Sequence, residues 1–306
     1  RLTGVVVDGK SGRGIVRAKI FVDATGDGDL CARLGVTSYQ YDAPQPPTTC
    51  AFLGGCDAAP TALIGQDMVQ HGRDYNLEPG FVWGSMLPGG DTFMLAGTRV
   101  RGVDCANAAD LTHAEIEGRR QVRAILDLIR SHHPDSELRL VDIPASIGIR
   151  DSRHFECQYQ LTGTDILEGR RFPDAIANGS YQVDIHHQDK PGITFMLLDG
   201  RRTYAQPGKP AVKDRWRDPI AEDPTFYQVP LRSLIPTDHD NLILAGRMLD
   251  ADKTAFSAVR VMVNTNQMGE AAGTAAFLAF SSNTPVQNLN PADVRRLLTK
   301  GGSIII

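Results

Sequence analysis

The stretch that decides the fold is residues 18–30, which read AKIFVDATGDGDL. Its apolar residues run into a glycine turn and then towards a helix, as a buried strand of a parallel sheet does. Near the other end of the chain, residues 241–247, NLILAGR, repeat the strand and its glycine turn. Such turns place backbone N–H groups at the edge of a sheet, where anionic oxygen atoms bind. We therefore expect strands at 21–25 and 242–245 to pair in one sheet.

The composition is that of an ordinary globular protein. Of the 306 residues, 42% are hydrophobic and 22% are charged, which is enough for a sizeable core in one large or two medium domains. The net charge of −4 provides no basic field for a polyanion. This excludes nucleic acid and acidic membranes as expected partners and favours a small organic substrate. A homo-oligomer is compatible with this composition.

The cysteines indicate the compartment. They are odd in number and form no Cys-x-x-Cys, which argues against a disulfide framework and against a metal site. We therefore expect a cytoplasmic protein without a bound metal. No apolar run reaches the roughly 18 residues that a membrane span requires, and no signal peptide precedes Arg1. Because the first residue is not Met, we expect the beginning of a longer chain to have been cut.

Proline-dense stretches predict where the chain crosses between domains. The first contains Pro44, Pro46 and Pro47, and the second contains Pro207, Pro210, Pro219 and Pro224. The sequence thus predicts an α/β protein in which residues 1–43 and 225–306 form one discontinuous domain. Residues 44–224 form an inserted α+β domain.

The first domain begins with short local elements. Residues 3–8 and 15–23 are β-rich runs around a Gly-rich turn, a composition that predicts a hairpin. A short helix is expected at 30–34, ending at Gly35.

Two longer helices are expected further along the chain. One follows Asp110, where Thr112 and Glu115 have the spacing of a capping box. Its apolar positions, spaced for one helical face, are Val122, Ile125, Leu126 and Ile129. The other helix is expected over about 257–280, where small residues would allow close packing on a sheet or a cofactor.

Residues 26–31, GDGDLC, imitate a dinucleotide-binding fingerprint but do not complete it. The third glycine of that motif is replaced by Cys31, and no strand with an acidic end follows about 20 residues later. Residues 39–47, YQYDAPQPP, cannot continue a βαβ unit. An NAD(P)-binding enzyme is therefore a remote alternative.

The whole chain nevertheless resembles the FAD-dependent oxidoreductases of the glutathione-reductase-like Rossmann superfamily. The resemblance is to a bacterial group distantly related to the fumarate reductase flavoprotein. It is carried by blocks in order: VDATGDGD at 22–29, IRDSR at 149–153 with YQLT at 159–162, FPDAIANGSYQVDIH at 172–186, and LAGRM at 244–248 with RVM at 260–262 and MGEAAG at 268–273.

The resemblance implies a fold and a cofactor. It implies a partial FAD-binding Rossmann-like domain built from both chain ends, with the inserted domain holding the substrate. The residues that it places at FAD are Thr25, Gly26, Asp27, Gly246, Arg247, Arg260 and Gly269. Glycines allow the backbone to approach the cofactor closely, and a helix N-terminus favours its anionic or carbonyl oxygens.

Members of that superfamily normally open with a strand, a Gly-x-Gly-x-x-Gly turn and a helix that bind the ADP half of FAD. This sequence begins beyond such a unit. The expected function is hydride transfer between a flavin and a small organic, carboxylate-bearing substrate. The alternative is a non-catalytic fragment, or a subunit whose partner supplies the missing half.

The candidate substrate residues are Arg150, Arg153 and His186. Two arginines three residues apart could clamp a carboxylate, and a histidine could move a proton beside the flavin. The alternative for the arginines is structural pairing with Asp151, Glu156 or Asp184. His186 and His187 could instead be an ordinary loop pair, and Tyr75, Trp83 and Tyr181 either line an apolar pocket or lie in the core.

Overall fold

The parallel strand pair joins the two ends of the chain. In the computed structural model, which describes residues 1–306, β3 (Phe21–Asp23) pairs with β16 (Leu242–Leu244). The prediction that these ends share a sheet is confirmed, although both strands end earlier than expected. β16 is buried on both faces, because Ile243 belongs to one hydrophobic core while Leu242 and Leu244 belong to another.

The largest core surrounds the C-terminal helices. It contains 29 buried residues, drawn from residues 161–183 and from residues 227–298. Residues 161–183, assigned to the inserted domain from the sequence, thus share their core with the C-terminal part of the chain. The elements here are α4 (Gly163–Leu167), β10 (Ala175–Gly179), β15 (Tyr227–Pro230), η2 (Leu231–Leu234), α5 (Lys253–Val259), α6 (Met262–Ser282), η3 (Val286–Asn288) and α7 (Pro291–Lys300).

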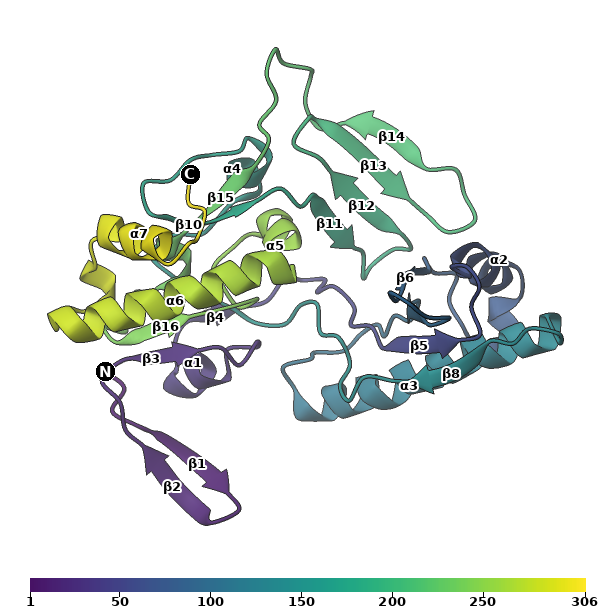
Figure 1. Cartoon of the computed structure of the whole chain (residues 1–306), viewed down its shortest axis with the longest axis horizontal. Coiled ribbons are helices and arrows are strands. Elements are labelled where there is room, and N and C mark those ends of the chain that lie inside the picture. Colours follow the sequence, from purple (N-terminus) through teal and green to yellow (C-terminus); the bar gives the residue numbers. More distant parts are fainter.

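A separate lobe lies on the right in Figure 1. It is an antiparallel sheet in the order β6-β7-β5-β8, with α2 and α3 packed together beside it, around a core of 15 buried residues. Its elements are β5 (Cys50–Gly54), α2 (Thr61–His71), η1 (Gly72–Tyr75), β6 (Trp83–Met86), β7 (Phe93–Ala96), α3 (Ala108–His132) and β8 (Arg139–Asp142).

The helix expected after Asp110 is α3, and its four apolar positions are buried on one face, as predicted. The predicted capping box of Thr112 and Glu115 does not form. The helix begins earlier, because the Asn107 side chain accepts hydrogen bonds from the backbone of Ala109 and Asp110. Thr112 lies inside the helix and donates to the carbonyl of Ala108.

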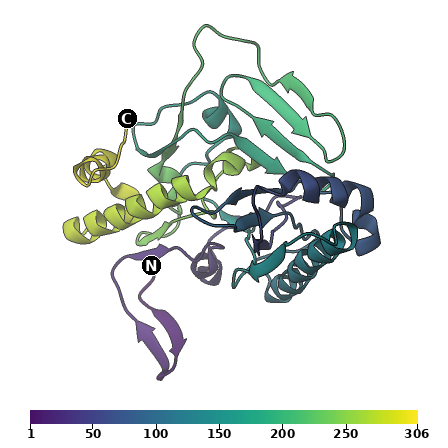
Figure 2. The same ribbon diagram turned by 45° about the vertical axis from the view of Figure 1, so that its right-hand side comes forward.

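A second antiparallel sheet lies above the lobe and above α6 in Figure 1, and it has the same position in the turned view of Figure 2. Its strands follow one another in sequence: β11 (Val183–His186), β12 (Ile193–Met196), β13 (Arg201–Ala205) and β14 (Val212–Arg215). A short pair, β4 (Ser38–Tyr39) with β9 (His154–Phe155), lies in the segments that connect the parts.

The N-terminal hairpin projects from the rest of the molecule (Figure 1). It consists of β1 (Val5–Gly9) and β2 (Gly12–Val16), so the hairpin is confirmed, but its second strand stops at Val16 instead of continuing to Asp23. The short helix is confirmed as α1 (Asp29–Leu34). It ends at Gly35, whose φ of 74° only glycine adopts readily.

The expected helix at 257–280 is split into α5 and α6. Val261 between them has extended backbone angles (φ −72°, ψ 153°), which ends one helix and begins the next. The fold is a mixed α/β arrangement with several small sheets, and none of its helices is both long and apolar enough to cross a membrane.

Candidate active site

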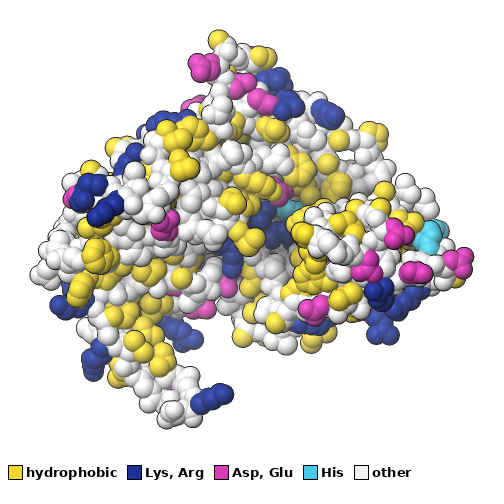
Figure 3. All heavy atoms as spheres, viewed as in Figure 1, with side chains coloured by type: hydrophobic (Ala, Val, Ile, Leu, Met, Phe, Trp, Pro, Cys, Tyr) yellow, Lys and Arg dark blue, Asp and Glu magenta, His cyan; other side chains and the backbone are white.

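A cleft of about 670 Å³ lies where the lobe, the β11–β12 strands and the start of α6 meet. Figure 3 shows a hollow in this face of the molecule, with basic and histidine side chains at its base. The hydrophobic residues lining the cleft are Phe81, Val82, Trp83, Ile149, Ile193, Phe195, Val261 and Met262, with Tyr181 at the side. Apolar walls around a few charged groups are typical of a small-molecule site.

Four Arg, Asp and His side chains converge on this cleft: Arg150, Asp184, His186 and Arg260. Asp184 lies between two of them, with Oδ1 3.3 Å from His186 Nε2 and Oδ2 3.4 Å from Arg260 Nη2. Arg150 has no carboxylate partner and donates to the carbonyl of Pro46 at 2.7 Å. The structural pairing with Asp184, left open by the sequence, is therefore made by Arg260 and not by Arg150.

Positive charge exceeds negative charge in the cleft. Burial, together with the charges of Arg260 and Arg99, lowers the pKa of Arg150 to about 9, so its guanidinium remains a cation at neutral pH. Burial by itself would raise the pKa of Asp184, but the His186 ring and Arg260 outweigh it and lower that pKa. The cleft thus contains two arginine cations and one carboxylate, an arrangement that favours an anionic ligand.

His186 is neutral in this setting. Burial lowers its pKa to about 4, and the positive charges of Arg150 and Arg260 act in the same direction, against the effect of Asp184. Its Nε2 lies beside Asp184, whereas Nδ1 is buried without a partner. A neutral imidazole with one free nitrogen can accept a proton, and the neighbouring carboxylate stabilises the imidazolium that results.

The break between α5 and α6 contributes to the same cleft. Arg260 ends α5, and Val261 and Met262 at the start of α6 line the cavity. The first N–H groups of a helix have no partner within it and carry the positive end of its dipole. A continuous helix, as expected from the sequence, would have no free N-terminus at this place.

Gln45, which the sequence did not predict as a site residue, connects the cleft to the protein interior. Its side chain is 1% exposed. Oε1 accepts from the His186 backbone N–H at 3.0 Å and from Arg260 Nη2 at 3.3 Å, and Nε2 donates to Ser257 Oγ at 3.0 Å. No sequence signal marks a glutamine between prolines. Asp184 was also not predicted as a site residue. Residues i and i+2 of a strand lie on the same face, so Asp184 shares a face of β11 with His186.

The two glycine turns meet at a second place. Arg247 Nη2 donates to Asp27 Oδ1 at 3.1 Å, and a Cβ on Gly26 would come within 3.0 Å of that Nη2 atom. Gly26 has φ 90° and Gly246 has φ 125°, which side chains rarely adopt. Thr25 shapes the first turn by donating to Asp23 and accepting from the backbone N–H of Asp29.

Arg153 lies at these turns and not in the cleft. Its Nη2 donates to Asp29 Oδ1 at 2.5 Å, while the neighbouring Ser152 donates to Asp27 at 2.6 Å. Arg153 Nε and Arg247 Nη1 are buried without a hydrogen-bond partner. The structure therefore brings Arg150 and His186 together but separates Arg153 from them, so the expected fork of two arginines does not form.

The other residues expected at the cofactor are dispersed. Arg260 lies in the cleft with Arg150, as described above. Gly269 lies on the exposed face of α6, where an added Cβ would meet no atom within 4 Å. Of the three aromatic residues considered from the sequence, Trp83 and Tyr181 line the cleft, whereas Tyr75 packs against the core of the lobe. His187 contacts Thr194 through Nε2 at 2.8 Å.

The family is established by a model that matches nearly the whole chain. Residues 1–298 match the model of the FAD dependent oxidoreductase family. The chain therefore belongs to that family, whose members are enzymes and use FAD, and the family implies a Rossmann-like fold. No curated protein and no solved structure matches the chain.

The residues at the glycine turns fit an anionic cofactor such as FAD. FAD contains a pyrophosphate, and the turns offer two buried guanidinium N–H groups without partners. Both turns follow the carboxyl ends of adjacent parallel strands, the usual place for a ligand in an open α/β sheet. No group of three or more His, Cys, Asp or Glu side chains is placed to hold a metal ion.

Proposed function

We propose that this enzyme transfers a hydride between FAD and a small carboxylate-bearing molecule bound in the cleft. We further propose that it belongs to the glutathione-reductase-like superfamily, in the bacterial group related to the fumarate reductase flavoprotein. The parallel pairing of β3 with β16, each followed by a glycine turn, supports this narrower assignment.

The observation that carries the proposal is the surplus of cationic charge in a cleft with apolar walls. Arg150 donates only to a backbone carbonyl, so its remaining N–H groups are available to a ligand. A planar guanidinium matches the geometry of a carboxylate and holds it with two parallel hydrogen bonds. The start of α6 adds further N–H groups to the same space.

FAD, when bound, supplies the two-electron chemistry. In this proposal the turn backbone at Thr25, Gly26 and Gly246, together with the guanidinium groups of Arg153 and Arg247, holds its anionic oxygens. Asp27 accepts from Arg247 and so orients that guanidinium. Arg150 and Arg260 bind and orient the substrate carboxylate. His186 accepts the proton that the substrate loses, at Nδ1, while Asp184 at Nε2 orients the ring. The apolar walls exclude water from the reacting atoms.

The test is reduction of the bound flavin without oxygen. The protein is mixed with small hydroxy acids and, in parallel, with their uncharged amides, and the flavin absorbance bands are followed. We expect only the acids to bleach the flavin. Equal bleaching by the amides would contradict the carboxylate site. If the acids leave the flavin oxidised, and unsaturated acids also fail to reoxidise the reduced flavin, the proposed reaction class is wrong.

A further inference from the structure

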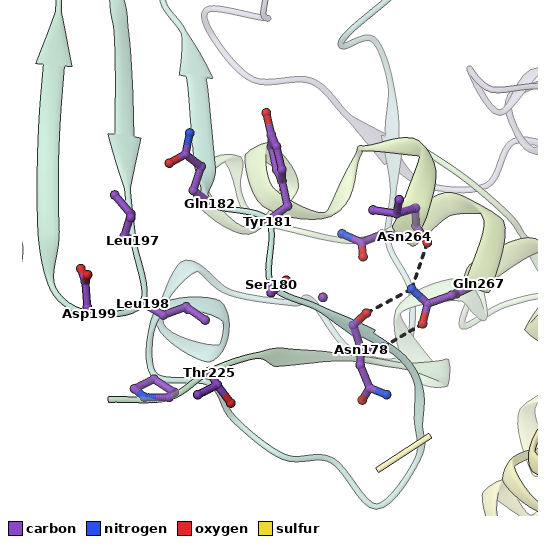
Figure 4. Close-up of a pocket in the computed structure, with 13 residues that line it drawn as sticks. Asn178, Ser180, Tyr181, Gln182, Leu197, Leu198, Asp199, Thr225, Asn264 and Gln267 are labelled. Carbon is purple, nitrogen blue, oxygen red and sulfur yellow. Dashed lines mark hydrogen bonds between the residues drawn. The ribbon is translucent and has the colours of Figure 1, made fainter. Parts of the chain in front are cut away.

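A second cavity adjoins the cleft, on the other side of Tyr181. It has a volume of about 780 Å³ and lies between the end of β10, the first turns of α6 and the loop that joins β12 to β13. Tyr181 lines both cavities. Figure 4 shows the amides and hydroxyls that surround this second space. We refer to it as the amide-lined cavity.

Some of these polar side chains are already hydrogen-bonded to other parts of the chain and stabilise the fold. Gln267 uses both ends of its amide on the backbone of Asn178: Oε1 accepts from the N–H at 3.0 Å and Nε2 donates to the carbonyl at 3.1 Å (Figure 4). The Asn178 side chain accepts from Gln228 and donates to the carbonyl of Ile304. These groups hold α6 against β10 and have little capacity left for a ligand.

Other polar groups have no partner within the chain. The Ser180, Gln182 and Thr225 side chains make no hydrogen bond and surround the opening. The decisive group is Asn264, which is 0% exposed. Its Nδ2 donates to Tyr227 and to the carbonyl of Ala258, but its Oδ1 is buried without a partner. A buried acceptor without a partner is unfavourable, and a ligand hydroxyl would remove that cost.

The charges of the amide-lined cavity differ from those of the cleft. No Lys, Arg or His lines it, and its only charged residue is Asp199. It therefore offers no cationic side chain to pair with a phosphate or a carboxylate. Amides and hydroxyls both donate and accept hydrogen bonds, which complements a hydroxyl-rich molecule. The apolar residues, Leu197, Leu198, Pro224 and Val263, provide surfaces for its C–H groups.

We propose that the amide-lined cavity binds a neutral, hydroxyl-rich group, either a sugar ring or a polyol chain. This inference rests on the proposed function in one respect: because Tyr181 borders both spaces, we assign this group to the end of the substrate remote from its carboxylate. The substrate class is then a sugar acid or a related polyhydroxy acid. The carboxylate lies by Arg150, and the hydroxyl groups lie by Asn264 and the residues around the opening.

The proposal is tested by ligand-observed NMR on the oxidised protein, where no reaction is needed. Three probes are compared: glucose, which is neutral; gluconate, which has both features; and propionate, which has only the carboxylate. We expect gluconate to bind more tightly than either of the others. The Gln182→Ala, Thr225→Val double variant should weaken glucose and gluconate about tenfold, the loss expected for one or two hydrogen bonds, and leave propionate unchanged.

Asn264→Ala should have at least the same effect. Because it also removes the bonds to Tyr227 and Ala258, its folding is checked by thermal unfolding, and the double variant at the opening serves as the test if Asn264→Ala does not fold. Asn266→Ala, at an exposed position on the same helix outside the cavity, is the matched control, since it removes the same side-chain amide.

The outcomes separate the two proposals. If glucose and gluconate bind equally well to wild type and to the double variant, or if glucose does not bind at all, the amide-lined cavity is not a polyol site. If glucose binding depends on the cavity but propionate fails to bind, the cavity proposal stands and the carboxylate cleft is wrong. If propionate binds, and if its affinity falls in Arg150→Lys but not in the double variant, the carboxylate site in the cleft is supported whatever the result for glucose.

Discussion

The two arginine-containing regions of this enzyme differ in how their charges are balanced. At the glycine turns each arginine faces its own aspartate: Arg247 pairs with Asp27 and Arg153 with Asp29. The cleft contains two arginines, Arg150 and Arg260, but a single carboxylate, Asp184. Of the two arginines, only Arg260 contacts it. The two ion pairs at the turns therefore cancel, and the further carboxylate there, Asp23, accepts from Thr25 and from the Cys31 backbone N–H, whereas the cleft is cationic.

This difference separates two ways of binding an anion. A neutral region with fixed backbone N–H groups recognises shape and hydrogen-bond direction, which suits a cofactor that stays bound. A region with surplus charge in an apolar cleft attracts an anion from solution and holds it in one orientation. We expect variants at the turns to change cofactor content and variants in the cleft to change kinetics.

The largest expected effect is that of His186→Ala. If the ring accepts the substrate proton, kcat should fall on the order of a hundredfold, because general-base catalysis contributes at least that much. Steady-state kinetics measures the change. His187→Ala is the matched control, since His187 contacts Thr194 and does not line the cleft. An equal fall in kcat in both variants would show that His186 is not the proton acceptor.

The next effect concerns the turns. Gly246→Val places a β-branched side chain at φ 125°, a strained conformation that costs about 2 kcal/mol or more. FAD should then be retained on the order of thirtyfold more weakly. The flavin absorbance per protein after purification measures it. Full flavin content in this variant, with the fold intact, would show that the turn does not belong to the cofactor site and that the two arginine-containing regions do not bind different anions.

A smaller effect is expected from Arg150→Lys. An ammonium keeps the charge but loses the two parallel hydrogen bonds, so KM should rise about tenfold with kcat little changed. Arg202→Lys is the control, because Arg202 pairs with Asp214 on the exposed sheet. A fall in kcat at unchanged KM would show that Arg150 acts on the reacting atoms and not on the bound carboxylate.

The smallest effect is on stability. The folded pKa of His186 is about 4, below its ordinary value of 6.5, so the unfolded chain takes up the proton first as the pH falls. The free energy of unfolding should therefore decrease below pH 6.5, by about 1 kcal/mol between pH 7 and pH 5.5 from this residue. Urea unfolding of wild type and His186→Asn at both pH values measures it. An identical pH dependence in the two proteins would contradict the buried neutral ring.

Several local elements could be predicted from the sequence alone, and the resemblance to a flavoprotein family predicted the cofactor. The parallel pairing of residues near 21 and 242 was predictable, because strands buried on both faces need continuous apolar residues and end in turns that require glycine. The same holds for α1, which ends at Gly35, and for the buried face of α3. The strands, α1 and the buried face of α3 each depend on residues close together in the sequence, so their patterns can be recognised without the tertiary fold. The pairing of the two strands joins distant segments, and it was inferred because both segments have the same strand-and-turn pattern.

Which charged side chains face one another could be seen only in the folded structure. Arg150 and Arg153 are three residues apart, yet Arg150 lies in the cleft and Arg153 lies at the turns. Their partners, Pro46 for Arg150 and Asp29 for Arg153, are both far from them in the sequence. The break at Val261, the place of Arg260 and the bridging role of Gln45 were equally hidden. A side chain's partners depend on the packing of remote segments, and the burial that shifts the pKa values of Arg150 and His186 exists only after those segments have packed.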